Sequence, residues 1–230
     1  MNLVTVDASF RYERKFLAPH RAHAELTPWL KLNPALFSPV FQPRTVNNIY
    51  LDNPALDCFF QNVRGVPNRA KIRIRWYGRT LGHIPHPVLE FKLKHGLVGT
   101  KQSFPLAPFS LDDRFTGRTL AGVFAESTLP FGIRARLQPL APTLLNRYQR
   151  EYFQSANRRH RLTLDSHLDF FALRSTHNTL RLKRSFPFRV LELKYDRAHA
   201  EGTDQITNTL PFRATRMSKY VVGMQALEGQ

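Results

Sequence analysis

The chain has 230 residues, of which 42% are hydrophobic, and its 34 Lys and Arg residues against 17 Asp and Glu give a formal net charge of +17. This apolar content is enough for a buried core, in one large domain or two small ones. The charge implies a polyanionic partner, which could be nucleic acid, an anionic membrane or a phosphate-rich small molecule.

Two further features narrow the class of protein. The single cysteine, Cys58, excludes an internal disulfide framework and fits a reducing compartment. The first residues lack the basic and apolar regions of a signal peptide, and no apolar run approaches the roughly 20 residues of a membrane span. We therefore expect a soluble, cytoplasmic protein with no membrane segment.

Apolar and charged residues alternate in many short segments. Successive side chains of a strand point to opposite faces, so the bases of KIRIRWYG (71–78) share one face and its Ile and Trp residues the other. In chain order, this alternation predicts strands over 11–16, 45–52, 71–78, 88–94, 147–153, 160–166, 179–183 and 190–196.

Helical spacing is less frequent. It predicts helices in PALDCFFQNV (54–63), in RMSKYVVGMQAL (216–227), over 21–26 up to Pro28, and near 119–125. The Pro-punctuated stretch 105–142 is interpreted as an insertion or lid. Since neither an internal repeat nor a Gly/Ser linker divides the chain, we expect residues 1–230 to form a single domain of class α+β.

The polar strand faces are rich in Arg and Lys and poor in Thr, Ser and Gln. On an open sheet such a face attracts nucleic acid, whereas in a barrel with its polar face inward it forms a cationic tunnel with helices outside. Many buried like charges are unfavourable without a bound anion, so a tunnel implies a compact, highly charged ligand. Glu90 and Glu192 among these bases suggest a divalent cation shared with that ligand.

Eight motifs, in order, carry a resemblance to a known family: RYERKF, NNIYLD, AKIRIRWYG, LEFKLK, RYQREYF, RLTLD, LELKYD and RMSKYVVG. Over roughly residues 9–227 the chain resembles the VTC-type polyphosphate polymerase domain, a branch of the triphosphate tunnel metalloenzymes (CYTH-like superfamily). The resemblance implies an eight-stranded antiparallel β-barrel tunnel with peripheral helices. It implies binding of ATP and inorganic polyphosphate, transfer of the ATP γ-phosphate to the chain end, and assistance by Mn²⁺ or Mg²⁺. The bases of KIRIRWYG would then face inside.

The same resemblance assigns roles to individual residues. It places catalytic phosphate contacts at Arg73, Arg75, Lys92, Arg150 and Arg161. It places phosphate or nucleotide binding at Lys15, Lys101, Arg216, Ser218 and Lys219, and the metal at Glu192. Arg11 stands where many tunnel triphosphatases have a glutamate, which favours the polymerase branch and leaves Glu192 as the main metal ligand. No general base is expected, because the attacking terminal phosphate is already ionised.

Two other functions stay open, namely a metal-dependent triphosphatase and a non-catalytic binder of polyphosphate or nucleic acid. We expect no specific nucleic-acid binding, because the densest charge would lie in a tunnel too narrow for a duplex. The regulatory and membrane segments of eukaryotic relatives are not evident, which leaves a membrane-protein partner unknown.

Cys58 and Trp76 are interpreted as core residues, Tyr77 as able to stack on a base, and the histidines as lacking a metal-site pattern. Solvated or structural roles are expected for Lys94, Arg181, Lys183 and Arg184.

Overall fold

The computed structural model describes residues 5–7, 11–19, 23–96, 98–173, 180 and 183–228. Its main strands are β1 (Thr5–Asp7), β2 (Arg11–Pro19), β3 (Ser38–Asp52), β4 (Asn68–Tyr77), β6 (Val88–His95), β7 (Val98–Pro105), β9 (Ala141–Gln154), β10 (His160–Ala172), β11 (Lys183–Ser185) and β12 (Phe188–Asp196). They form one antiparallel ten-stranded sheet in the order β1-β7-β6-β4-β3-β9-β10-β12-β2, with β11 beside β10. A small second sheet pairs β5 (Gly82–Ile84) with β8 (Phe109–Leu111).

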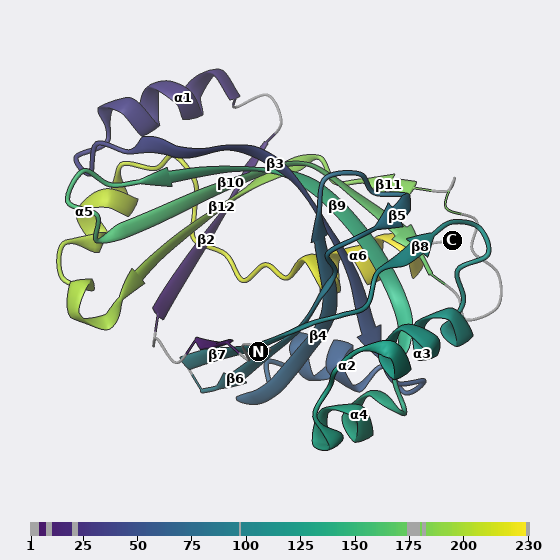
Figure 1. Ribbon diagram of the computed structural model, residues 1–230. Coiled ribbons are helices and arrows are strands. Elements are labelled where there is room, and N and C mark those ends of the chain that lie inside the picture. Colours follow the sequence, from purple (N-terminus) through teal and green to yellow (C-terminus); the bar gives the residue numbers. More distant parts are fainter. Residues whose placement is uncertain are drawn as a thin grey trace.

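The helices are α1 (His23–Leu32), α2 (Asp57–Val63), α3 (Gly117–Glu126), α4 (Phe131–Leu137), α5 (Thr203–Asn208) and α6 (Lys219–Glu228), with a 3₁₀ turn at Arg197–His199. Figure 1 shows α1, α3, α4 and α5 outside the curled sheet, whereas α2 packs against α6 through Phe59 and Tyr220, whose ring centroids are 6.2 Å apart. The class α+β is thereby confirmed. Of the described helices, none has both the length and the apolar character needed to cross a bilayer.

Two apolar layers explain the positions of the outer helices. Leu26 and Leu30 of α1 and Ile206 of α5 pack on the outer face of β2, β10 and β12. Residues of β8, α3 and α4 pack on the outer face of β4 and β6. The stretch 105–142 is therefore part of the outer cover, and its interpretation as a lid is wrong.

The helix predicted to end at Pro28 continues to Leu32, because burial of its apolar side offsets the lost hydrogen bond.

The two edges of the main sheet lie close together. Asp7 of β1 pairs with β7, Arg11 of β2 pairs with β12, and only three residues separate them, so their Cα atoms are at most roughly 15 Å apart. The free edge of β2 is occupied by the segment before α6: Phe16 pairs with Ala214, and the Thr215 N–H donates to the Lys15 carbonyl (2.8 Å). In the described part of the chain, β2 and β7 do not pair. The predicted closed eight-stranded barrel is thus a curled ten-stranded sheet whose seam is partly filled by this segment.

Helix α6 packs against the concave face of the sheet, where Figure 1 shows it between the strands. Tyr220 stacks on Tyr50 with ring centroids 4.9 Å apart, and its hydroxyl donates to Asp52 (2.7 Å). Gly223 faces Phe170 and Leu144 directly. The expectation that all helices are peripheral is therefore wrong for α6, because its apolar side is complementary to the concave face.

We expect Gly223→Ala to destabilise the protein relative to Gly122→Ala. Both glycines lie inside helices and gain similar helix propensity from alanine. A Cβ at Gly223 would lie 2.5 Å from Phe170 Cδ1 and 2.6 Å from Leu144 Cδ2, whereas one at Gly122 meets nothing within 4 Å. Overpacking costs about 1–3 kcal/mol, so the unfolding free energies of the two variants should differ by about that amount in urea titrations. Equal stabilities would contradict the packing of α6.

Candidate functional site

The orientation of KIRIRWYG is decided by its apolar side chains. Ile72, Ile74 and Trp76 are at most 6% exposed and lie in the outer core with α3 and α4. Lys71, Arg73 and Arg75, on the opposite face of β4, consequently face the concave side of the sheet. The expectation that these bases point inward is confirmed.

One group of interior charges surrounds Glu90 on β6. Arg73, directly opposite on β4, donates to Glu90 Oε2 from two nitrogens at 2.7 Å each. Lys101 on β7 lies 3.3 Å from Oε1, and Arg75 lies 3.8 Å from Oε2. Burial by itself would raise the pKa of Glu90, but these three cations hold it well below the ordinary value. We call these four residues the Glu90 cluster.

A second group surrounds Glu192 on β12. Its Oε1 lies 3.2 Å from Lys219 and 3.8 Å from Lys15, and its Oε2 lies 3.4 Å from Arg150 and 3.6 Å from Lys194. Burial opposes ionisation, yet the four cations keep the pKa of Glu192 well below its ordinary value. The carboxylate is therefore ionised and shared among cations from four different elements.

Asp165 on β10 completes this Glu192 cluster (Lys15, Arg150, Asp165, Glu192, Lys194 and Lys219). It is fully buried and accepts two hydrogen bonds from Arg150 (2.6 and 2.7 Å), with Lys219 at 2.5 Å. Both cations also lie over the Tyr148 ring, at 5.2 and 4.8 Å from its centroid. Asp165 thus fixes the guanidinium of β9 and the ammonium at the start of α6 in one place.

Three lysines lie in a row across β4, β6 and β7. Lys71 is directly opposite Lys92, and Lys92 is directly opposite Lys101. Burial, together with the charges of Lys15 and Arg69, lowers the pKa of Lys71 to about 7. Burial and the charge of Arg73 hold the pKa of Lys92 well below its ordinary value. Adjacent like charges across strands are unfavourable, so this lysine row favours binding of an anion.

Glu13 on β2 is a further carboxylate on the concave face, and its side chain is partly accessible to solvent. Its side chain lies 2.9 Å from Lys15 and 3.8 Å from Lys194, the two lysines that also contact Glu192. Burial and the nearby Glu192 raise its pKa, but Lys15 and Lys194 prevail and lower it to about 2. Glu13 and Glu192 therefore present two ionised carboxylates, joined by shared lysines, on neighbouring strands.

The arrangement fits a divalent cation that arrives with a phosphate. In the described part of the chain, no three His, Cys, Asp or Glu side chains converge into a metal cage. The carboxylates of Glu13 and Glu192 are nonetheless hard oxygen donors on the concave face, and Mg²⁺ is commonly held by one or two carboxylates plus substrate phosphates and water.

Most residues singled out from the sequence belong to these clusters, with three exceptions, Arg161, Arg216 and Ser218. Arg161 is exposed at the end of β10, opposite Lys194, and Arg216 is exposed before α6 and makes no ion pair with the described residues. Ser218 accepts a hydrogen bond from the Val221 N–H (3.4 Å) in the first turn of α6. The expected core residues include buried Trp76 and half-buried Cys58.

The sequence reasoning missed Glu13, Lys71, Asp165 and Tyr148 as members of the site. Three of them could have been found by continuing the alternation along the strand: Glu13 precedes Lys15 by two residues, Lys71 precedes Arg73 by two, and Asp165 follows Arg161 by four. Of the expected solvated residues, Lys183 lies 3.6 Å from Asp169 and Lys94 is half-buried, while Arg181 lies outside the described residues.

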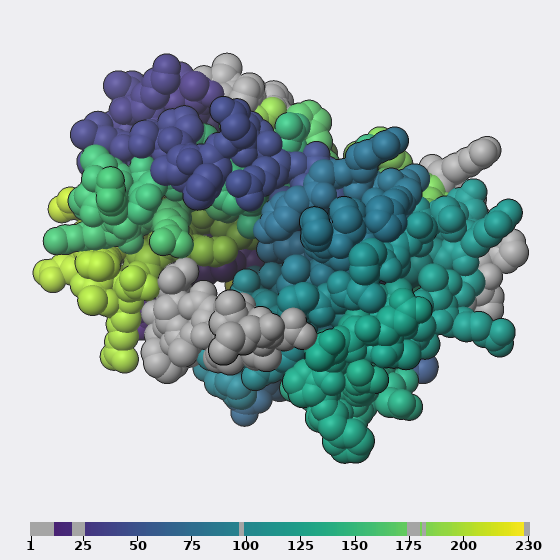
Figure 2. Space-filling view, in the orientation of Figure 1, coloured from purple at the N-terminus to yellow at the C-terminus, as the bar shows by residue number. Residues whose placement is uncertain are grey.

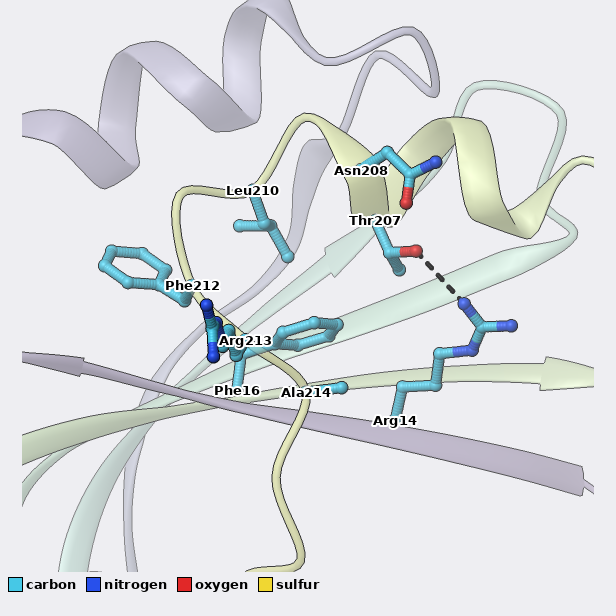
Figure 3. A pocket seen from close by; sticks show the side chains of 8 residues that line it. All are labelled: Arg14, Phe16, Thr207, Asn208, Leu210, Phe212, Arg213 and Ala214. Atoms are coloured by element: carbon cyan, nitrogen blue, oxygen red, sulfur yellow. Dashed lines mark hydrogen bonds between the residues drawn. The ribbon is translucent and has the colours of Figure 1, made fainter.

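A cavity of about 360 Å³ lies elsewhere, between β2, α5 and residues 208–214 (Figure 3). Arg14, which lines it, donates to Thr207 (3.1 Å) and Asp204 (2.5 Å). Because Arg14 and Phe16 are on the face of β2 opposite to Lys15, this cavity is separate from the concave charged site.

Comparison with known proteins shows which family the chain resembles. The family model of the VTC domain matches residues 10–228. HpAC1 from Hippeastrum, a proposed adenylyl cyclase described as having a dominant triphosphatase activity, has a TM-score of 0.50 at 14% identity, covering 94% of this chain and 95% of its own. The PH1819 protein from Pyrococcus horikoshii OT3 has a TM-score of 0.52 at 15% identity, covering 94% of this chain and 99% of its own.

At such identities the two structures show a shared fold alone. A search of curated proteins found no match. The family model, by contrast, spans the chain from the first long strand to the last helix and includes both charge clusters. The chain belongs to the VTC domain family.

Proposed function

We propose that this protein is a polyphosphate polymerase that transfers the γ-phosphate of ATP to the end of an inorganic polyphosphate chain. The observation that supports this best is the excess of cations over carboxylates on the concave face, in particular Lys71 and Lys92, which lie directly opposite each other and make no ion pair within the described residues. Neighbouring buried like charges are unfavourable unless a ligand compensates them or one of the groups loses its charge. A linear polyphosphate supplies such charge at regular intervals. We propose that residues 1–230 act together as one domain.

The chemistry requires no protein nucleophile. An oxygen of the terminal phosphate of the chain attacks the γ-phosphorus, the bond from that phosphorus to the β,γ-bridging oxygen breaks, and ADP leaves with the bonding electrons. Catalysis then consists of alignment and charge neutralisation. Arg75 and Arg150 can each grip a phosphate with two N–H groups, while the lysines act as point charges along which a chain can slide.

Glu192 and Glu13 are the residues that would hold a Mn²⁺ or Mg²⁺ ion. When bound, the ion would neutralise the negative charge of the reacting phosphates. In the free protein the carboxylate of Glu192 is shared among Lys15, Arg150, Lys194 and Lys219. Phosphates that attract these lysines would release its oxygens for the metal.

A metal-dependent triphosphatase is the second candidate, because two ionised carboxylates, Glu13 and Glu192, lie near the same cations. Purified protein incubated with ATP and Mn²⁺ separates the candidates on a gel stained for polyphosphate. Chains of increasing length with release of ADP support the polymerase. Phosphate or pyrophosphate without chains would identify a hydrolase, and binding without turnover would leave a polyanion-binding protein.

Arg75→Ala should abolish synthesis with only a modest loss of stability, which comes from the hydrogen bond that Arg75 donates to the buried Asn48 Oδ1 (3.0 Å). Arg75 touches Glu90 only at 3.8 Å, so its removal leaves the 2.7 Å Arg73–Glu90 pair intact. Arg73→Ala should also abolish synthesis but lower the melting temperature, because it leaves Glu90 buried with weaker partners. The matched control is Arg118→Ala, an exposed arginine of α3. Near-normal synthesis by Arg75→Ala would contradict a role for the concave face.

Glu192→Gln tests the metal assignment. The amide keeps the shape of the side chain but not the negative charge that a hard cation requires. We expect turnover to be lost, or to need a far higher Mn²⁺ concentration, while polyphosphate binding is kept or strengthened. A Mn²⁺ titration of activity, with melting temperatures measured in parallel, distinguishes this from a role in charge balance. An unchanged Mn²⁺ requirement, with lower stability, would remove Glu192 from the metal site.

Binding of a polyanion at pH 8 should take up protons at the lysine row. With a pKa of about 7, Lys71 is mostly neutral at that pH, and a neighbouring anion raises the pKa and so protonates it. Affinity should therefore fall as the pH rises above 7. Calorimetric titration with inorganic tripolyphosphate in buffers of different ionisation enthalpy measures the uptake.

Lys71→Arg should reduce that uptake while keeping affinity, because arginine stays charged. Lys31→Arg, at an exposed position of α1, controls for the exchange of lysine for arginine. Protons that tripolyphosphate itself exchanges on binding contribute equally to each variant, and this contribution disappears when the uptake of one variant is subtracted from that of the parent protein. An uptake that is the same in Lys71→Arg as in the parent protein would rule out Lys71 as its source.

A further inference from the structure

Three aromatic side chains surround one guanidinium at an end of the concave face. Arg44 Cζ lies 5.5 Å from the ring centroid of Phe41 and 5.9 Å from those of Tyr77 and Tyr152. Phe41 and Tyr152 meet edge to face with centroids 5.7 Å apart. We call these four residues the aromatic rim. None of these four residues belongs to the Glu90 cluster or the Glu192 cluster.

The rim is open to solvent because of how the strands end. β4 pairs with residues 46–51 of β3, and among the described strands the earlier part of β3 pairs with β9 alone. Phe41 is accordingly 59% exposed and Tyr77 52% exposed. Single exposed aromatic residues are common, but a group of them around an arginine is typical of surfaces that bind flat π systems.

The rim adjoins the phosphate-binding groups. Tyr77 follows Arg75 by two residues on the same face of β4, and Tyr152 follows Arg150 by two on β9, a distance of about 7 Å along a strand. Arg44 lies directly opposite Arg150. In Figure 2 the surface is hollowed between the purple-blue and green residues on one side and the teal residues on the other. A ribose spans a similar distance between a base and its first phosphate.

We infer that the aromatic rim binds the nucleobase of the nucleoside triphosphate. A ring of Phe41 or Tyr77, or the plane of Arg44, would stack on the base while the triphosphate extends past Arg75 and Arg150 into the charged clusters. The inference rests on the proposed function, since it assumes that the phosphates bind on the concave face. The rim would let the protein distinguish a nucleotide donor from the polyphosphate chain, which has no base.

Inorganic tripolyphosphate and ATP separate the two parts of this proposal, because they share a triphosphate and differ in the nucleoside. Calorimetry with a chelator present measures both dissociation constants without turnover. Tyr77→Ala and Phe41→Ala should each weaken ATP binding about tenfold, the typical loss on removing one stacking ring. Binding of tripolyphosphate should change less than about twofold, since the charged groups are untouched.

Two control variants sharpen the measurement. Tyr77→Phe keeps the ring and should bind ATP like the parent protein. Phe131→Ala removes an aromatic side chain that is 88% exposed on α4, away from the rim, and should change neither constant. Melting temperatures close to the parent value would show that Tyr77→Ala and Phe41→Ala fold normally.

The possible failures are distinguishable. If both rim variants bind ATP normally, or lose affinity for ATP and tripolyphosphate equally, the nucleobase site is wrong and the proposed function stands. If the parent protein binds neither ligand, the proposed function fails, and the inference with it. A loss confined to ATP supports both.

Discussion

The structure depends on sharing a few buried carboxylates among many buried cations. Glu90, Asp165 and Glu192 each contact at least two bases, and every carboxylate is nearly inaccessible to water. Desolvating so many charges is costly, and good geometry with shared partners is what offsets the cost. Every second side chain of a strand points to the same face of the sheet. The charged residues can therefore line the concave face while the apolar residues between them form the core on the other face.

Helix α6 connects this electrostatic arrangement to the packing of the fold. Its apolar residues fill the concave face beside Tyr50, Leu144 and Phe170, and its first residue, Lys219, contacts Asp165 and Glu192. The segment before α6 pairs with β2, and the Met217 carbonyl accepts a hydrogen bond from Lys15 (3.0 Å). The last part of the chain thus shapes both the seam of the sheet and the centre of charge, so a packing defect in α6 would also displace the site.

The two candidate enzymatic functions use the same groups and differ in the attacking oxygen, which comes from a phosphate in a polymerase and from water in a hydrolase. In either case the same cations, with a metal ion if one binds, would stabilise the transferred phosphoryl group. The proposal of a long polyanion as the acceptor rests on Lys71 and Lys92, two facing lysines that make no ion pair within the described residues. A nucleobase site at the aromatic rim would allow the protein to distinguish the nucleotide that donates the phosphate from the polyphosphate chain that accepts it.

Local sequence patterns determined much of this protein. The alternation in KIRIRWYG, VLEFKLK and VLELKYD is sufficient to predict strands with one basic and one apolar face, since strand periodicity is a property of neighbouring residues. The ordered motifs determined the family and most of the interior bases. They did not determine that Glu90 would be held by Arg73, that Asp165 would join Arg150 to Lys219, or that Arg44 would lie among Phe41, Tyr77 and Tyr152. These contacts join residues from different elements. The registers of β4 with β6, of β9 with β10 and of β3 with β9, together with the inward packing of α6, decide them. The sequence patterns also did not determine whether the sheet closes into a barrel. Residues 214–215 pair with the edge of β2 that would otherwise be available for closing the barrel.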